Sequence, residues 1–130
     1  MDKQTETVND IQTLLKFTFG LIAIIAGADK FTNLLTDWNH YLSPTIASFL
    51  PVSVSVFMKI VGIIEIVAGI VVFVRPKMGG YIVCTWLVLI SLNLVLHGDL
   101  LDVAVRDMAM AIGAFSLARL SIISNTTFSK

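Results

Sequence analysis

The chain has 130 residues, enough for one domain, and 56% of them are hydrophobic while only 14% are charged. A soluble domain of this size needs a more polar surface, with about a quarter of its residues charged. The net charge is zero and no basic patch is present, so the composition argues against nucleic-acid binding. These features predict one integral membrane domain over residues 1–130, with the lipid bilayer as its main partner.

The first predicted membrane helix covers about residues 11–31. The polar stretch before it lacks the basic region of a signal peptide, and Asp29 and Lys30 stand where a small-residue cleavage site would be needed. Its length meets the roughly 20 mostly apolar residues that a helix needs to cross the hydrocarbon core. We therefore expect a retained transmembrane helix.

A longer connection, residues 32–51, separates the first two helices. Within it, Ser43 followed by Pro44 is typical of an N-cap and the first position of a helix. Trp38, His40 and Tyr41 precede this pair, and aromatic residues favour the headgroup level. A short interfacial helix of one or two turns is the prediction here.

Three further helices are expected over about residues 52–74, 79–97 and 101–120. The alternation at the start of the first of these resembles a strand, but an isolated strand in lipid would leave its backbone groups unpaired. The short loops between these helices predict that consecutive helices pack antiparallel. The predicted fold is therefore an all-α, antiparallel four-helix membrane bundle.

The basic residues predict the orientation of this bundle. With four spans, the two termini and the loop around Arg75 share one side of the membrane. That side holds the larger set of basic residues: Lys3, Lys16, Arg75, Lys77, Arg119 and Lys130. The positive-inside rule then predicts that both termini lie in the cytoplasm.

Glu65, near the middle of the second predicted helix, is the most informative ionisable residue. A charged side chain at that depth costs on the order of 3 kcal/mol on insertion scales and usually faces the interior of a bundle. Gly62, Ala68 and Gly69 lie on the same helical stripe, and small residues of this kind allow another helix to approach closely. We expect Glu65 to point into the bundle.

The last predicted helix carries Asp102, Arg106 and Asp107. Asp102 and Arg106 are one turn apart and could pair along the helix. Arg106 is always charged and needs a carboxylate partner at this depth, for which Glu65, Asp102 and Asp107 are the candidates. The alternative is that such a pair only fixes the register of the helices.

Other polar residues fall in the same outer half of the predicted bundle. Together with those above they predict an outward-facing polar pocket of nine residues: Asp29, Lys30, Lys59, Glu65, Asn93, His97, Asp102, Arg106 and Asp107. Cys84 is the only cysteine, and His40 and His97 are far apart in sequence, so no metal or haem site is expected. The sequence shows no evident cofactor signature, but the pocket is compatible with a quinone or another lipophilic ligand.

Three short patterns carry a family resemblance: residues 26–31 with Asp29-Lys30, residues 62–69 with Glu65, and residues 102–107 ending in Arg106-Asp107. In this order and spacing the chain resembles the DoxX-like family of small four-helix bacterial membrane proteins, over residues 15–121. The resemblance implies a multi-pass protein of the bacterial cytoplasmic membrane, linked to redox or quinone metabolism. It also implies that Glu65, Arg106 and Asp107 form the polar core.

Three functions are compatible with these features. The first is an accessory subunit that binds a quinone and works with a membrane or soluble redox partner, since the chain has no flavin, haem or dithiol signature of a complete enzyme. The second is a non-catalytic scaffold or assembly factor. The third is a small-solute carrier or channel, which ranks lower because four helices are few unless they form a homo-oligomer, and because no helix has an internal Gly/Pro break.

Overall fold

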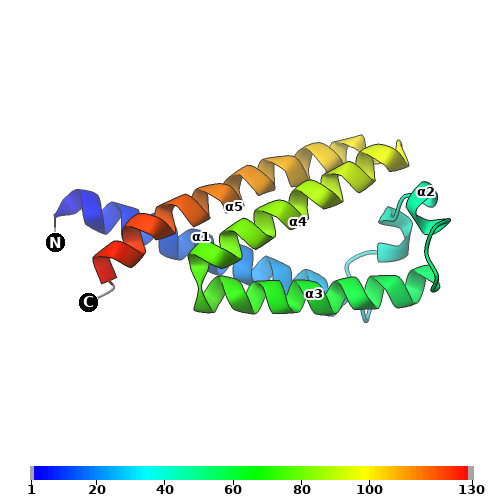
Figure 1. Ribbon diagram of the computed structural model, residues 1–130, viewed down its shortest axis with the longest axis horizontal. Coiled ribbons are helices and arrows are strands. Elements are labelled where there is room, and N and C mark those ends of the chain that lie inside the picture. Colours follow the sequence, from blue (N-terminus) through cyan, green and yellow to red (C-terminus); the bar gives the residue numbers. More distant parts are fainter. Residues whose placement is uncertain (1, 129–130) are drawn as a thin grey trace.

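The computed structural model describes residues 2–128, and over this range the fold is all-helical. Four long helices are joined by turns and by one longer connecting segment, residues 30–53, which holds two short helical turns (Figure 1). In chain order the elements are α1 (Lys3–Asp29), η1 (Trp38–Tyr41), α2 (Pro44–Ala47), α3 (Val54–Val74), α4 (Pro76–His97) and α5 (Leu101–Phe128).

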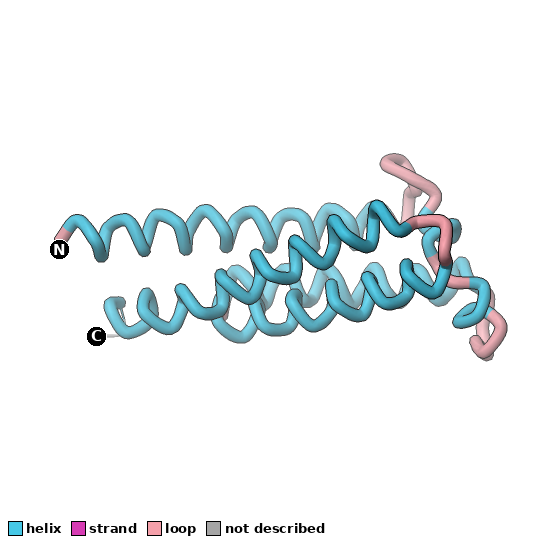
Figure 2. The backbone as a smooth tube through the Cα atoms, turned by 90° about the horizontal axis from the view of Figure 1, so that it is seen from above, coloured by secondary structure: helices cyan, strands magenta, loops and turns pink. Residues whose placement is uncertain are grey.

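The long helices lie side by side, and consecutive ones run in opposite directions (Figure 1). Helix α1 packs mainly on α3, and α4 packs mainly on α5. Both termini and the α3–α4 turn lie at one end, which we call the termini end. The connecting segment and the α4–α5 turn lie at the other, the connector end, where the α4–α5 pair diverges from α3 (Figures 1 and 2).

The predicted elements are present, with shifted ends. Helix α1 begins at Lys3 because the Asp2 carboxylate caps it, accepting a hydrogen bond of 2.8 Å from the Thr5 amide. That bond holds the pKa of the Asp2 carboxyl below its usual range. The expected short helix is α2, with Ser43 as its N-cap and Pro44 as its first residue.

Helices α1 and α3 approach closely at two glycines. A Cβ on Gly27 would lie 2.5 Å from the Gly62 carbonyl oxygen, and a Cβ on Gly62 would lie 2.6 Å from that of Gly27. Only residues without a side chain allow two backbones this close. This contact places Lys30, one turn beyond Gly27, against the α3 stripe that carries Glu65.

The surface of the molecule is apolar while part of its interior is charged. Leu14, Val67 and Ile112 are more than half exposed on α1, α3 and α5, whereas Glu65 and Lys30 are each only 6% exposed. Water-soluble proteins rarely expose large apolar patches, whereas a lipid-facing bundle has an apolar surface and keeps charged side chains in its interior. Glu65 thus points inward, as predicted.

Three helices in the described range are long and apolar enough to cross a membrane: α1, α3 and α4. Helix α5 is as long but is not among them. It carries Asp102, Arg106 and Asp107 within its first two turns and Arg119 further along.

Candidate functional site

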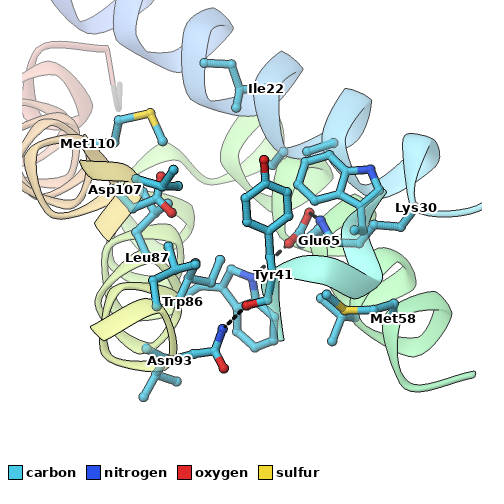
Figure 3. Close-up of a pocket in the computed structure, with 18 of the residues that line it drawn as sticks. Ile22, Lys30, Tyr41, Met58, Glu65, Trp86, Leu87, Asn93, Asp107 and Met110 are labelled. Atoms are coloured by element: carbon cyan, nitrogen blue, oxygen red, sulfur yellow. Dashed lines mark hydrogen bonds and ion pairs between the residues drawn. The ribbon is translucent and has the colours of Figure 1, made fainter. Parts of the chain in front are cut away.

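A cavity of about 580 Å³ lies between the four long helices and under the connecting segment. Most of its wall is apolar, contributed by residues such as Phe19, Val61, Val83 and Leu87. The polar residues of the wall come from the connecting segment and from α3, α4 and α5: Lys30, Thr36, Tyr41, Glu65, Asn93, Arg106 and Asp107. Figure 3 shows Lys30, Tyr41, Glu65, Asn93 and Asp107 among them. A mostly apolar pocket with a few convergent polar groups is typical of a small-molecule site.

A buried ion pair forms one wall of the cavity. The Nζ of Lys30, the C-cap residue of α1, lies 2.8 Å from the Glu65 Oε2 of α3, and both side chains are at most 7% exposed. The other carboxylate oxygen, Oε1, accepts a hydrogen bond of 3.2 Å from the Trp86 indole N–H of α4. Glu65 therefore joins three helices, and its charge is balanced inside the bundle.

The connecting segment supplies a further partner for Lys30. Its ammonium lies 3.9 Å from the centroid of the Trp38 ring, a cation–π contact. The Trp38 indole N–H in turn donates to Asp29 Oδ2 at 2.8 Å. Lys30 is thus held between a carboxylate on one side and an aromatic face on the other.

Asp29 organises the start of the connecting segment. Its carboxylate accepts hydrogen bonds from the Leu34 and Leu35 amides at 3.0 Å, from the Thr32 hydroxyl at 3.0 Å and from Trp38. All of these donors lie within nine residues of Asp29. Asp29 was predicted as a pocket residue, but its carboxylate is occupied by the loop and it is not part of the cavity wall.

Arg106 and Asp107 line the opposite wall, on α5. The Asp107 carboxylate is buried, and Figure 3 shows it across the cavity from Glu65 and Lys30. The Arg106 side chain is 66% exposed, and one of its nitrogens lies 3.5 Å from Asp107 Oδ1. Of the three candidate partners of Arg106, the structure places Asp107 beside it, while Glu65 pairs with Lys30 instead.

Asn93 and His97 of α4 hold the connecting segment over the cavity. The Asn93 amide donates to the Tyr41 carbonyl and accepts from the Ser43 amide, both at 2.8 Å. His97 Nε2 lies 2.9 Å from the His40 carbonyl oxygen. Asn93 also lines the cavity, whereas His97 does not, so His97 is placed to fix the loop and not to contact a ligand.

Tyr41 is a site residue that sequence reasoning assigned only to the interface. Its ring projects into the cavity between Asp107 and the Lys30–Glu65 pair (Figure 3). The Tyr41 hydroxyl accepts a hydrogen bond of 3.4 Å from the Thr36 hydroxyl, which leaves its own proton to donate.

Two further predicted pocket residues, besides Asp29 and His97, do not line the cavity. Lys59 and Asp102 are both exposed, and neither contributes to the cavity wall. Lys59 lies nearly two turns from Glu65 on α3, and its side chain does not share the inward stripe. The sequence already indicated that Lys59 and Glu65 lie on different faces of the helix. Residues on one face are three, four or seven positions apart, and Lys59 is at none of these spacings from Glu65.

The described residues contain no group of three or more His, Cys, Asp or Glu side chains that could hold a metal ion. His40 and His97 do meet, with ring centroids 5.6 Å apart, although they are 57 residues apart in sequence. No protein-family model, curated protein or solved structure matches the chain.

Proposed function

We propose that this protein is an integral membrane protein that crosses the bilayer four times and binds a quinone, or a chemically similar lipophilic carbonyl compound, in the cavity described above. The observation that carries this proposal is the make-up of that cavity. Its wall is mostly apolar, as a lipophilic ring requires, and its few polar groups converge from different elements.

The polar groups are suited to a carbonyl ligand. The Tyr41 hydroxyl and the Arg106 guanidinium retain donors that no neighbouring side chain takes up fully, and a quinone offers two carbonyl acceptors. Glu65 and Asp107 lie on facing walls and are the carboxylates available for proton exchange. A redox partner protein would supply electrons, as expected for a DoxX-like accessory subunit of the bacterial cytoplasmic membrane.

Four spans are supported by the shape of the bundle. Helix α5 runs along α4, a candidate span, and its three charged residues nearest the connector end fall within two turns of its first residue. Arg106 at this level could extend its guanidinium to the headgroups, while Asp107 is buried. Both termini lie at one end, and the basic-residue bias favours a cytoplasmic position for that end.

The orientation can be tested by cysteine labelling in a Cys84→Ala background. Lys77→Cys, at the α3–α4 turn, should react with a membrane-impermeant maleimide only after permeabilisation. Asp99→Cys, at the α4–α5 turn, should react in intact cells. The reverse pattern would invert the topology, and equal labelling at both positions would contradict membrane insertion.

Binding is best followed through tryptophan fluorescence, because the only two tryptophans, Trp38 and Trp86, both line the cavity. An added quinone should quench this fluorescence saturably and raise the melting temperature of the detergent-solubilised protein. Glu65→Gln should abolish the rise, and Lys59→Gln, which alters an exposed charge on the same helix, should retain it. No quenching and no thermal shift with any quinone tested would overturn the proposal.

A non-catalytic scaffold is the second candidate, and one observation favours it. Both oxygens of Glu65 already have partners within the protein, so the ion pair could serve only to hold three helices together. In that case Lys30→Met combined with Glu65→Leu should leave function intact provided that the protein still folds. The quinone proposal expects the same double variant to fold and to lose ligand binding.

A further inference from the structure

Exposed residues line the cavity on the side of the bundle where α1 and α5 meet, which we call the α1–α5 seam. Ile22 of α1 and Arg106 of α5 both line the cavity, yet Ile22 is 44% exposed and the Arg106 side chain 66% exposed. We take these two residues as the rim of an opening on that side; Leu35 of the connecting segment and Leu89 of α4 also line the cavity and are exposed. Ile22 and Met110 stand on one side of the cavity, one from each helix (Figure 3).

In the described part of the chain, direct contacts join α1 and α5 towards the termini end, and no hydrogen bond or ion pair joins them nearer the connector end. Towards the termini end, Gln12 donates to the Ser121 hydroxyl at 3.2 Å, and a Cβ on Gly113 would lie 2.9 Å from the Phe19 ring. Beyond Phe19, no hydrogen bond or ion pair links α1 to α5 in the part of the chain that the structure describes. Of the cavity residues of α1 beyond Phe19, Ala23 and Ala26 are small and Ile22 is larger.

Contacts hold the connecting segment over the cavity. On the side of α3 and α4, the connecting segment packs Leu42, Ile46 and Leu50 into a cluster with Met58 and Trp86. At the connector end, the hydrogen bonds of Asn93, His97 and Asp29 tie the same segment to α4 and α1. A ligand arriving from water would have to displace this segment, whereas one arriving through the seam would not.

We propose that the cavity is loaded sideways from the bilayer through the α1–α5 seam, and that its ligand is a quinone with a long alkyl or isoprenoid tail. The ring lies among Tyr41, Glu65 and Asp107, and the tail leaves past Ile22 into the acyl chains. This inference rests on the proposed function, and it adds the route of entry and the need for a tail. The apolar level of the opening, next to Ile22 and Met110, matches a hydrocarbon tail.

The test cross-links α1 to α5 across the seam. Ile22→Cys and Met110→Cys are combined in the Cys84→Ala background, reconstituted in phosphatidylcholine vesicles and linked by a short bis-maleimide. The probe is a benzoquinone with a ten-carbon tail and no unsubstituted ring position to which a thiol could add, and the readout is quenching of Trp38 and Trp86. The matched control links the same helices below the cavity, through Gln12→Cys and Ser121→Cys, which replace side chains already in contact.

We expect the link at Ile22 and Met110 to slow quenching at least tenfold, and the control link to leave it unchanged. When the quinone is bound before linking, its release on dilution should slow by a similar factor, which separates a blocked entrance from a damaged site. Unchanged entry and release after linking would overturn the sideways route while leaving the proposed function in place. Absence of quenching in the unlinked protein would instead overturn the proposed function.

Discussion

The two ends of the bundle use the same helices for different purposes. Towards the termini end, a cluster that includes Val72, Ala114 and Leu117 packs with little exposure, and Gly79 contacts Val72 directly. Towards the connector end, the helices diverge and enclose a cavity with charged groups in its wall. Close packing of small residues at one end therefore leaves the other end free to hold a ligand.

Buried polarity alone does not distinguish the two ends. Gln12 and Ser121 are both buried near the termini end, but they bond to each other and do not contribute to the cavity wall. Near the connector end, Glu65 is bonded as well, yet Tyr41 and, on the opposite wall, Arg106 keep donors for a further partner. Hydrogen-bond donors that remain unused beside a cavity indicate a ligand-binding site.

The largest effect should come from breaking the ion pair. Glu65→Leu leaves the Lys30 ammonium buried without its carboxylate, and we expect a loss of about 3–5 kcal/mol in the free energy of unfolding. Lys30→Met added to Glu65→Leu should recover most of this loss, because apolar groups of similar size replace both charges. Thermal or denaturant unfolding in detergent measures the difference, and equal instability of the single and double variants would contradict the assignment.

Adding a side chain should affect the two ends unequally. A Cβ on Gly80 would lie 2.9 Å from both the Ala114 oxygen and the Ala118 nitrogen, which are backbone atoms, so Gly80→Leu should cost about 3 kcal/mol or more. Ala26→Leu points its new atoms into the cavity and should cost less than about 1 kcal/mol while weakening quinone quenching. Equal costs in the same unfolding measurement would show that the cavity is not open space.

Removing the anchor of the connecting segment should have a local effect. Asn93→Leu deprives the Ser43 amide and the Tyr41 carbonyl of their partners, at a cost of about 1–3 kcal/mol. Amide hydrogen exchange should speed up in the connecting segment and stay unchanged in the middle of α4 and α5. Leu92→Ala, at an exposed neighbouring position, is the control, and uniform acceleration along the chain would contradict a local role.

The smallest effect concerns the first turn of α1. The pKa of Asp2 is lowered in the folded state, so its cap is fully present above the unfolded pKa and is lost as the pH falls through the lower folded value. After correction for the intrinsic exchange rate, the Thr5 amide should lose protection over that acidic range. Asp2→Ala should remove this pH dependence, Asp10→Ala should keep it, and an identical profile in both would refute the cap.

Local properties of the sequence determined the helices and the inward face of α3. Runs of apolar residues fix where a helix forms, and the Gly62, Ala68 and Gly69 stripe beside Glu65 predicted that this side would be buried, as it is. The Ser43-Pro44 pair likewise predicted α2. These signals lie within one or two turns of the chain, so they can be read without knowing what packs against them.

Only the tertiary structure decided which charges meet. Lys30 pairs with Glu65, which is 35 residues further along the chain. The Asp29 carboxylate accepts hydrogen bonds from the loop that follows it, and Lys59 is exposed outside the cavity. These outcomes depend on how α1 is rotated and how closely it approaches α3, which the Gly27–Gly62 contact sets. Residue periodicity fixes the faces of one helix, but the choice of partner on another helix is a property of both backbones together.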